Sequence, residues 1–356
     1  MPNNGNSHYA LCKLLRSSAA SVAAAACLVF SIPFSAEAGT QIAPSGFVYT
    51  ADEEGNTVSR LELATGEVST VPVSVTPHNV QVSVDGKKLF VVGMMTMKNV
   101  HGHGHDGAQG ILLVFDAAQF GKASPIEIEV GEHPAHVVVT ADGKLAFVTN
   151  SEGNDVSIVD VASSAVTKSV PTGKFPHGLR ISPDGTEAYV ADVKSDSVSV
   201  LDVTGAKEVA RIPVGKAPVQ VGFTPNGAEV FVSLRDDDQV VVVDTKTRKV
   251  VDRIAVGDAP IQVHATPDGR LVLVANQGTE AKPGDTVSVI DVAKRKVIAT
   301  IKTGPGAHGV AVDEKGRLAF VTNIYAGTLS VIDLATLKVT ATVKVGDGPN
   351  GVTYSK

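Results

Sequence analysis

The chain has 356 residues and a formal net charge of −6, from 31 lysines and arginines against 37 aspartates and glutamates. It contains no run of basic residues, so it lacks the electrostatic surface that binds nucleic acid or an anionic membrane. After residue 38, no apolar stretch approaches the roughly 20 residues that a membrane-spanning helix requires.

The first 38 residues are typical of a secretory signal peptide. Lys13 and Arg16 supply a basic start, residues 19–34 are apolar, and residues 36–38 (Ala-Glu-Ala) form a small-x-small cleavage site. We expect residues 1–38 to be removed on export to the periplasm or the outside of the cell. Residues 39–46 then lead into the folded domain, and the mature product is expected to be a monomer without a membrane span.

Both cysteines, Cys12 and Cys27, lie in the segment that is expected to be removed. The mature chain therefore has no disulfide, no thiol nucleophile and no Cys-x-x-Cys-His site for haem c. It also lacks a dinucleotide fingerprint, a P-loop, a Gly-x-Ser-x-Gly elbow and a His-Glu-x-x-His motif, so no NAD cofactor is expected.

A unit of about 42 residues recurs from residue 47 to residue 356. Its most regular part is a Pro-Asn/Asp-Gly turn, found at 182–185, 224–227 and 266–269. In the copy at 176–215, short apolar stretches at 176–181, 188–191, 198–202 and 208–214 each read as a strand. Four strands in a unit of this length are typical of a propeller blade.

The number of blades follows from an acidic residue that closes the third strand of every copy. The seven copies carry Glu62, Asp116, Asp160, Asp202, Asp244, Asp291 and Asp333. The chain begins in a second strand and ends in a first strand, so the last strand completes the blade that the N-terminus begins. The sequence thus predicts an all-β, seven-bladed propeller over residues 47–356, with four-stranded antiparallel blades and a ring closed by the C-terminal strand.

The repeats resemble the YVTN-type β-propeller family. Residues 147–150 and 320–323 read Phe-Val-Thr-Asn, and the variants Tyr-Val-Ala-Asp and Tyr-Thr-Ala-Asp occur at 189–192 and 49–52. The resemblance covers essentially the whole chain after the signal peptide and implies an exported or cell-surface protein. Many members of the family have no assigned activity, so the resemblance supports the architecture far more than any function. The chain has no tryptophan, which argues against the propeller quinoproteins with their docking tryptophans, so no PQQ is expected.

The chemistry-bearing residues are predicted to gather on one face of the disc, here called the top face. This is the face with the start of each first strand, the loops between second and third strands, and the linkers between blades. Two of those loops, within 90–116 and 273–291, are longer than their counterparts. All nine histidines after residue 38 fall on this face: His78, His101, His103, His105, His133, His136, His177, His264 and His308.

The longest predicted loop combines thioethers with imidazoles. It contains Met94, Met95, Met97, His101, His103 and His105, with glycines between the histidines. Imidazole binds zinc, copper and nickel, and thioether sulfur suits Cu(I). The loop is therefore a candidate metal site, with copper preferred to zinc, and the alternative is a solvated loop whose histidines have no metal.

A second candidate metal site lies at the mouth of the central channel. The first strands place His78, His177 and His308 at the same repeat position, whereas His136 is one residue further on and His264 three. Strand alternation predicts that His136 and His264 point the other way. The alternative is a structural role, in which the imidazoles hydrogen-bond to the linker backbone.

Other polar residues of the first strands form a predicted funnel for a small ligand or ordered water. They are Gln81, Arg180, Gln220, Gln262 and Asn350. Arg180 is a candidate for binding a carboxylate or a phosphate, as is Arg235 in a top loop, and the alternative for either is an ion pair with a nearby aspartate.

These observations predict an exported binding protein that holds a transition metal, copper or zinc, or a small ligand on its top face. A lactonase-like hydrolase or a copper-dependent oxidase with its centre at the channel mouth is an alternative. A further alternative is an interaction scaffold for another protein of the cell envelope. No catalytic residue is singled out by the sequence.

Overall fold

The computed structural model describes residues 44–95 and 109–356. The predicted signal peptide and four of the candidate ligands, Met97, His101, His103 and His105, lie outside the described residues. Among the residues that are described, no helix is long and apolar enough to cross a membrane.

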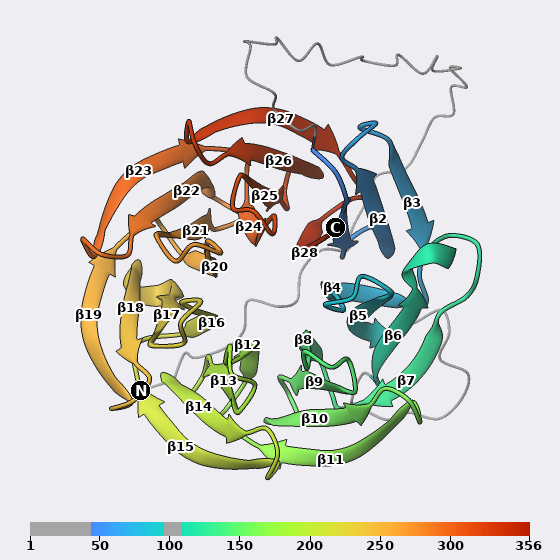
Figure 1. Cartoon of the computed structure of the whole chain (residues 1–356), viewed down its shortest axis with the longest axis horizontal. Helices are drawn as coiled ribbons and strands as arrows, with labels where there is room; N and C mark the ends of the chain where they lie inside the picture. The colour runs from blue at the N-terminus through green and yellow to red at the C-terminus, as the bar shows by residue number, and fades with distance from the viewer. Residues whose placement is uncertain (1–43, 96–108) are drawn as a thin grey trace, which may run out of the picture. The chain divides into compact units, whose positions relative to one another are not determined.

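Seven four-stranded antiparallel sheets form a ring of blades (Figure 1). The inner strands are β4 (Val75–Val82), β8 (Pro134–Val139), β12 (Pro176–Ile181), β16 (Pro218–Phe223), β20 (Pro260–Ala265), β24 (Ala307–Val312) and β28 (Pro349–Ser355). The second strands are β5 (Lys88–Met95), β9 (Leu145–Asn150), β13 (Glu187–Asp192), β17 (Glu229–Leu234), β21 (Leu271–Gly278), β25 (Leu318–Asn323) and β1 (Phe47–Asp52). The predicted seven-bladed, all-β propeller is therefore confirmed.

The outer half of each blade consists of two further strands. The third strands, each of which ends at its predicted acidic residue, are β6 (Gly110–Asp116), β10 (Asp155–Asp160), β14 (Ser197–Asp202), β18 (Gln239–Asp244), β22 (Pro283–Asp291), β26 (Thr328–Asp333) and β2 (Thr57–Glu62). The outer strands are β7 (Ile126–Val130), β11 (Ala165–Pro171), β15 (Lys207–Pro213), β19 (Lys249–Ala255), β23 (Lys296–Lys302), β27 (Lys338–Lys344) and β3 (Val68–Pro72). Two short 3-10 turns, η2 (Ala117–Gln119) and η3 (Arg235–Asp237), follow β6 and β17.

The ring closes by pairing of the two chain ends, as the repeat predicts. β28 lies antiparallel to β1, with Phe47 opposite Ser355 and Thr50 opposite Val352, in a blade of order β28-β1-β2-β3. Without this pairing, one edge of β1 and one edge of β28 would be exposed at the seam. The two strands instead hydrogen-bond to each other along these edges.

The turn between first and second strands shows why the repeat keeps its sequence. Ser182 donates its hydroxyl to Asp184 at 2.6 Å, and the backbone N–H of Gly185 donates to the carbonyl of Ser182 at 2.8 Å. Gly185 has φ of +75°, a conformation that glycine adopts without strain. Bonds of this kind fix the point at which each inner strand ends. The inner strands therefore also begin at equivalent positions, on the top face of the disc.

The end of each second strand is fixed by a buried polar residue. Asp192 accepts hydroxyl hydrogen bonds from Ser197 and Ser199 of the next strand, at 3.1 and 2.8 Å. Asn150, at the same repeat position, donates to Asp155 and Ser157 instead. Burial raises the pKa of Asp192 to about 6 despite those hydrogen bonds. The Asp/Asn of the repeat motif is thus a structural clamp between two strands.

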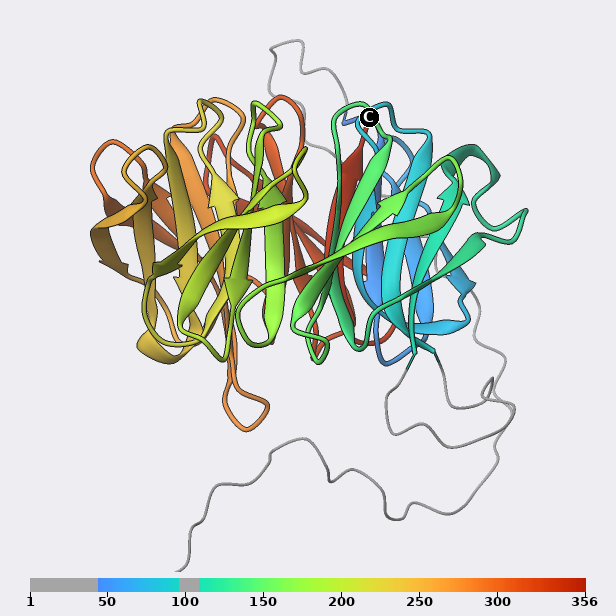
Figure 2. The ribbon, with the colours of Figure 1, turned by 90° about the horizontal axis from the view of Figure 1, so that it is seen from below.

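The insertion at 277–284 differs from the expected loop. β21 and β22 run past the end of the blade as a paired hairpin, with Gly278 opposite Pro283, and the hairpin projects below the disc in Figure 2. The hairpin leaves from the top face, which points down in Figure 2. Linkers and second-to-third loops share this face: in the blade of β12 to β15, the backbone N–H of Val193 in such a loop donates to the carbonyl of the linker residue Phe175. The insertion therefore extends a blade rather than forming a loose loop.

Candidate metal site in the central channel

All seven inner strands have a register irregularity at the same place, near their first residues. In β12, Pro176 pairs with Asp192 and Leu179 pairs with Val190, so three steps on the inner strand match two on its neighbour. A bulge of this kind breaks the strict alternation of side chains. The residues inside the bulge, such as His177, are consequently free to face the channel.

Every inner strand places a polar side chain in this bulge, and together we call them the polar layer: His78, Asn79, His136, His177, Gln220, Gln262, His308 and Asn350. Six of the eight are buried, and His78 and His177 are partly exposed. The layer therefore forms a polar belt around the channel wall near the top face.

Glycines make room for this layer. Four polar residues occupy the first bulge position; His177, His308 and Asn350 are followed by glycine, and His78 is followed by Asn79. A Cβ on Gly178 would lie 2.4 Å from Oε1 of Gln220, which is too close for any real contact. Each glycine thus leaves space for the polar group or backbone of the following blade.

Three histidines of the layer converge. The Nε2 atoms of His78 and His177 lie 3.2 Å apart, and one ring nitrogen from each of His78, His136 and His177 lies within 4.8 Å of the others. The rings of His136 and His177 have centroids 4.9 Å apart. These three residues, from β4, β8 and β12, form what we call the histidine cluster.

The second ring nitrogen of two cluster members already has an acceptor. Nδ1 of His177 lies 3.3 Å from the carbonyl oxygen of Val219, which can only accept, so this nitrogen carries the proton. Nδ1 of His78 lies 3.3 Å from Oε2 of Glu53 and 3.1 Å from Nδ2 of Asn350, so it donates to the carboxylate in one tautomer and accepts from the amide in the other. Asn350 donates to the same oxygen from Nδ2, at 2.5 Å.

This hydrogen bonding fixes what the two facing nitrogens can be. A neutral imidazole has one N–H and one lone pair. Nε2 of His177 therefore carries a lone pair, and Nε2 of His78 lies 3.2 Å from it. When Nδ1 of His78 donates to Glu53, two lone pairs face each other and favour a shared proton or metal ion; when Nδ1 accepts from Asn350, Nε2 of His78 donates directly to His177.

The electrostatics of the layer favour neutral imidazoles. Burial, together with the neighbouring imidazoles, holds the pKa of His136 and of His177 well below the usual range. Burial and the nearby His78 also lower the pKa of His308, to about 4. Neutral imidazole is the form that ligates metal ions.

Glu53 is the anion of the cluster. Burial alone would raise its pKa, but the contacts of the carboxylate with the His78 imidazole and the Asn350 amide lower the pKa to about 2. A carboxylate that accepts the N–H of a histidine orients the ring and increases the basicity of its other nitrogen. Glu53 therefore prepares Nε2 of His78 as a ligand.

The other predicted residues take different places. Gln220 and Gln262 hydrogen-bond to each other at 3.1 Å, and their amide nitrogens lie 3.5 and 3.4 Å from the ring nitrogens of His136. His308 directs Nδ1 to the carbonyl of Asn350 at 3.3 Å and is not in the cluster.

Three more predicted residues lie further along the inner strands, beyond the bulge. Gln81 donates to the carbonyl of Val82, and Arg180 and His264 lie at the same repeat position as Gln81. Of the two described methionines, Met94 ends β5 together with Met95, and Met95 packs against a core of apolar side chains. Arg235 pairs with Asp236 at 2.7 Å, the alternative given above.

Two features of the cluster differ from what strand alternation predicts. His136, expected to point away from His78 and His177, lies with them because all three residues stand at the bulges of their strands, where strict alternation is lost. Glu53 is absent from the predicted site. Its signal in the sequence is its place directly after the Tyr-Thr-Ala-Asp motif. The equivalent positions of the other six blades hold no acidic residue: Met94, Ser151, Val193, Arg235, Gln277 and Ile324.

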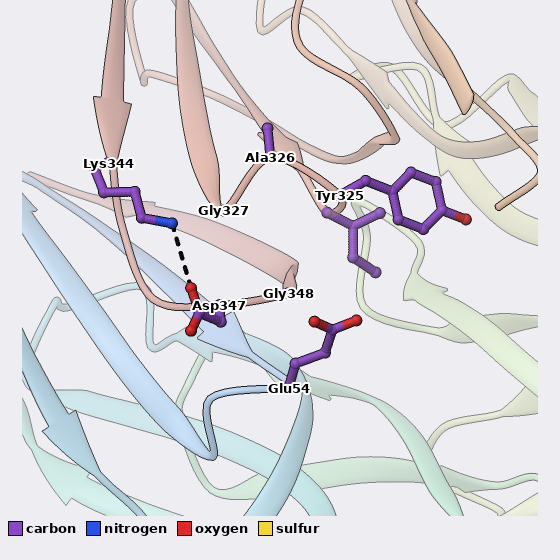
Figure 3. A pocket seen from close by; sticks show the side chains of 8 residues that line it. Glu54, Tyr325, Ala326, Gly327, Lys344, Asp347 and Gly348 are labelled. Carbon is purple, nitrogen blue, oxygen red and sulfur yellow. Dashed lines mark hydrogen bonds and ion pairs between the residues drawn. The ribbon is translucent and has the colours of Figure 1, made fainter. Parts of the chain in front are cut away.

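A separate cavity of about 290 Å³ lies at the top face, between the loop after β25 and the linker before β28 (Figure 3). Lys344 and Asp347 form an ion pair at 3.3 Å on its wall, and Glu54 directs its side chain toward it from the opposite side. None of the lining residues belongs to the polar layer. The candidate site is therefore the channel, not this cavity.

The fold defines the chain as a seven-bladed β-propeller of the YVTN type. Residues 127–356 match the family model described as YNCE-like beta-propeller, and the chain belongs to this family. The family resemblance of the repeats is thus confirmed. No curated protein sequence matches the chain.

Solved structures with this fold come from several bacteria. Kuenenia stuttgartiensis hydrazine synthase is 23% identical, with a TM-score of 0.67 over 80% of this chain and 91% of that chain. A functionally unknown protein from Desulfotomaculum acetoxidans DSM 771 is 14% identical, with a TM-score of 0.71 over 87% and 99%. A putative 6-phosphogluconolactonase from Bacteroides fragilis NCTC 9343 is 16% identical, with a TM-score of 0.71 over 90% and 100%. At these identities the likeness shows the fold alone.

Proposed function

We propose that this protein is an exported binding protein that holds one copper or zinc ion in its channel, on His78, His136 and His177. The observation that carries the proposal is the 3.2 Å separation of two Nε2 atoms whose partner nitrogens are both occupied. Two imidazole nitrogens on a tetrahedral zinc ion, each about 2.0–2.1 Å from it, lie about 3.3 Å apart. The separation therefore suits a shared metal ion.

The surroundings of the cluster support the same function. Nδ1 of His177 donates to the carbonyl of Val219, and Nδ1 of His78 lies against the Glu53 carboxylate, as the second nitrogens of metal-bound histidines usually do. Three imidazoles leave a fourth coordination position open for water or a small ligand. The negative charge of Glu53 offsets part of the charge of a divalent ion.

The ligand set also bears on which metal is held. Imidazole nitrogens suit divalent copper and zinc, and nitrogen sites generally bind Cu²⁺ more tightly than Zn²⁺. The three members of the cluster are all imidazoles, so the cluster itself does not favour Cu(I). Export is proposed from the pattern of residues 1–38, and copper and zinc traffic outside the cytoplasm fits a binding role there.

The test is a titration of untagged protein, freed of metal by chelation and dialysis, with Cu²⁺ and with Zn²⁺ by calorimetry. We expect one tight site per chain that His177→Ala abolishes. His133→Asn is the matched control, because His133 is also a partly buried histidine of the top face but lies outside the cluster. Asparagine tolerates the positive φ of 53° at that position.

A further variant separates the channel from the predicted loop site. Replacing His101, His103 and His105 together by serine should leave the tight site intact. If that triple variant loses the metal and His177→Ala keeps it, the loop is the binding site and the channel proposal is wrong. Wild-type protein that binds neither metal above trace would also refute it.

A further inference from the structure

One charged side chain lies in the channel beyond the histidine cluster. Arg180 follows His177 by three residues on β12, and it is half-buried. The corresponding positions of the other inner strands are uncharged or, for His264, neutral at neutral pH: Gln81, Val138, Gly222, His264, Ala311 and Thr353. Among these seven inner-strand positions, all in the described part of the chain, Arg180 alone carries a lasting charge.

The guanidinium of Arg180 has no carboxylate partner among residues 44–95 and 109–356. Its side-chain hydrogen bond goes to the carbonyl of Leu179, at 2.8 Å from Nη1. The other charged arginine predicted on the top face, Arg235, is paired with Asp236. A guanidinium has five N–H donors, so most of those of Arg180 are available to a ligand or to water.

The position of this charge follows from the packing of its neighbours. Leu179 and Ile181, on either side of Arg180 in β12, pack into an apolar core, so alternation places Arg180 on the opposite side of the strand, toward the channel. Val263 and Ala265 flank His264 in the same way on β20. Between β12 and β20, β16 has Gly222 at the equivalent position and adds no side chain.

Burial lowers the pKa of Arg180 to about 10, so the side chain keeps its charge at neutral pH. Burial and the charge of Arg180 lower the pKa of His264 to about 4, so that imidazole stays neutral. A half-buried cation without a counter-ion costs free energy, which a bound anion recovers. The channel thus offers one fixed positive charge beside a neutral imidazole that can donate one N–H.

We propose that the channel binds a small organic acid through a single carboxylate, held by Arg180 and hydrogen-bonded by His264. The planar fork of a guanidinium matches a carboxylate with two parallel hydrogen bonds. One positive charge balances a carboxylate, whereas a phosphate dianion would keep a buried negative charge. This site does not depend on the proposed metal, because it involves neither the cluster nitrogens nor Glu53.

The test uses metal-free, dialysed protein and sodium acetate as the probe. Thermal unfolding is followed across an acetate titration at constant ionic strength, with sodium chloride and sodium phosphate in parallel. We expect a saturable rise in melting temperature with acetate for wild type. Arg180→Gln should abolish the rise, and Arg180→Lys should weaken the apparent affinity at least tenfold. Arg235→Gln, at an arginine that already has its carboxylate, should respond as wild type does.

A second variant covers the case in which Arg180→Gln fails to fold. Arg180→Met keeps an aliphatic stem and removes the charge, so it should melt higher than wild type without acetate and show no acetate response. A structural ion pair would give the opposite result, a lower melting temperature. The proposal is refuted by a wild type that shows no saturable acetate effect, by saturation with phosphate or chloride in place of acetate, or by an unchanged response of Arg180→Met.

Discussion

The carboxylate of Glu53 lies 3.3 Å from Nδ1 of His78, and it is this contact that turns the other nitrogen of His78 toward His177. Glu53 belongs to the closing blade, just after β1, whereas His78 begins the next inner strand. Asn350 of β28 donates to the same carboxylate at 2.5 Å. The seam of the ring and the histidine cluster are thus connected through one side chain.

Replacing Glu53 by glutamine tests this connection. The amide keeps nearly the same shape but loses the negative charge that makes Nε2 of His78 a stronger ligand. We expect Glu53→Gln to weaken Cu²⁺ and Zn²⁺ binding by about 10-fold to 100-fold, the usual effect of losing such a partner, with the fold intact. Competition with a chromogenic chelator measures the affinity.

Glu54→Gln is the matched control, because Glu54 is the adjacent carboxylate, is exposed, and lies outside the cluster. It should bind metal as wild type does. Equal affinities for wild type and Glu53→Gln would mean that Glu53 does not prepare the ligand.

The sequence predicted the fold well because its signals are local and repeated. The turn at 182–185 and the acidic ends of the third strands, such as Asp202, recur in register, and each is satisfied by neighbours within its own blade. Ring closure followed from the same period, because a chain that starts in a second strand must end in a first.

The site was less predictable because it depends on contacts between distant blades. Alternation separated His136 from His177, and the bulge that joins them appears only when two strands are paired. Glu53 contacts residues 25 and 297 positions away in the chain, which no local pattern reports. Arg180 was noted in the sequence, but its lack of a carboxylate partner among the described residues required coordinates.

A second prediction concerns pH and the buried clamp at Asp192. One carboxylate oxygen of Asp192, Oδ1, has no hydrogen-bond partner among the described residues, and burial raises the pKa of this group to about 6 from 3.8. The folded protein therefore binds this proton more tightly than the unfolded chain does. The resulting stabilisation is complete below about pH 3.8 and is lost as the pH rises through about 6.

Asparagine removes this ionisation, and Asn150 and Asn323 already fill the equivalent positions, where they donate to Ser and Thr hydroxyls or to Asp155. We expect Asp192→Asn to increase the free energy of unfolding by about 1–2 kcal/mol at pH 8, with the gain vanishing near pH 4. Urea denaturation across this pH range measures it.

Asp184→Asn provides the control, because hydrogen bonds in its exposed turn lower the pKa of Asp184. That variant should show no gain at pH 8. A gain for Asp192→Asn that is the same at every pH, or a loss at pH 8, would contradict the explanation by burial.

A third prediction concerns export. If residues 1–38 form a signal peptide, the chain recovered from the periplasm or culture medium of an expressing bacterium begins at Gly39. Intact-mass measurement and N-terminal sequencing give the result directly. Replacing Ala36 and Ala38 by a bulky residue such as leucine should block cleavage, because the cleavage site needs small side chains. Recovery of the uncut wild-type chain in the cytoplasm would contradict the prediction.

The last prediction tests the closure of the ring. β28 supplies the inner strand of the closing blade, pairing with β1 from Ser355 to Pro349, and the ring of Tyr354 stacks on Phe320 of the neighbouring blade at 5.8 Å. Deleting residues 349–356 exposes the edge of β1 and uncovers apolar side chains of two blades. We expect a sharp fall in melting temperature or aggregation during expression.

The single substitution Tyr354→Ala separates the two contributions of β28. It removes the stacking on Phe320 and keeps the strand, so we expect a partial loss of stability, about 2–4 kcal/mol, with a monomeric and folded product. Unfolding by urea and size-exclusion chromatography measure both variants. A truncated protein as stable as the full chain would show that the blade closes without β28, and the pairing of chain ends would then not be what holds the ring together.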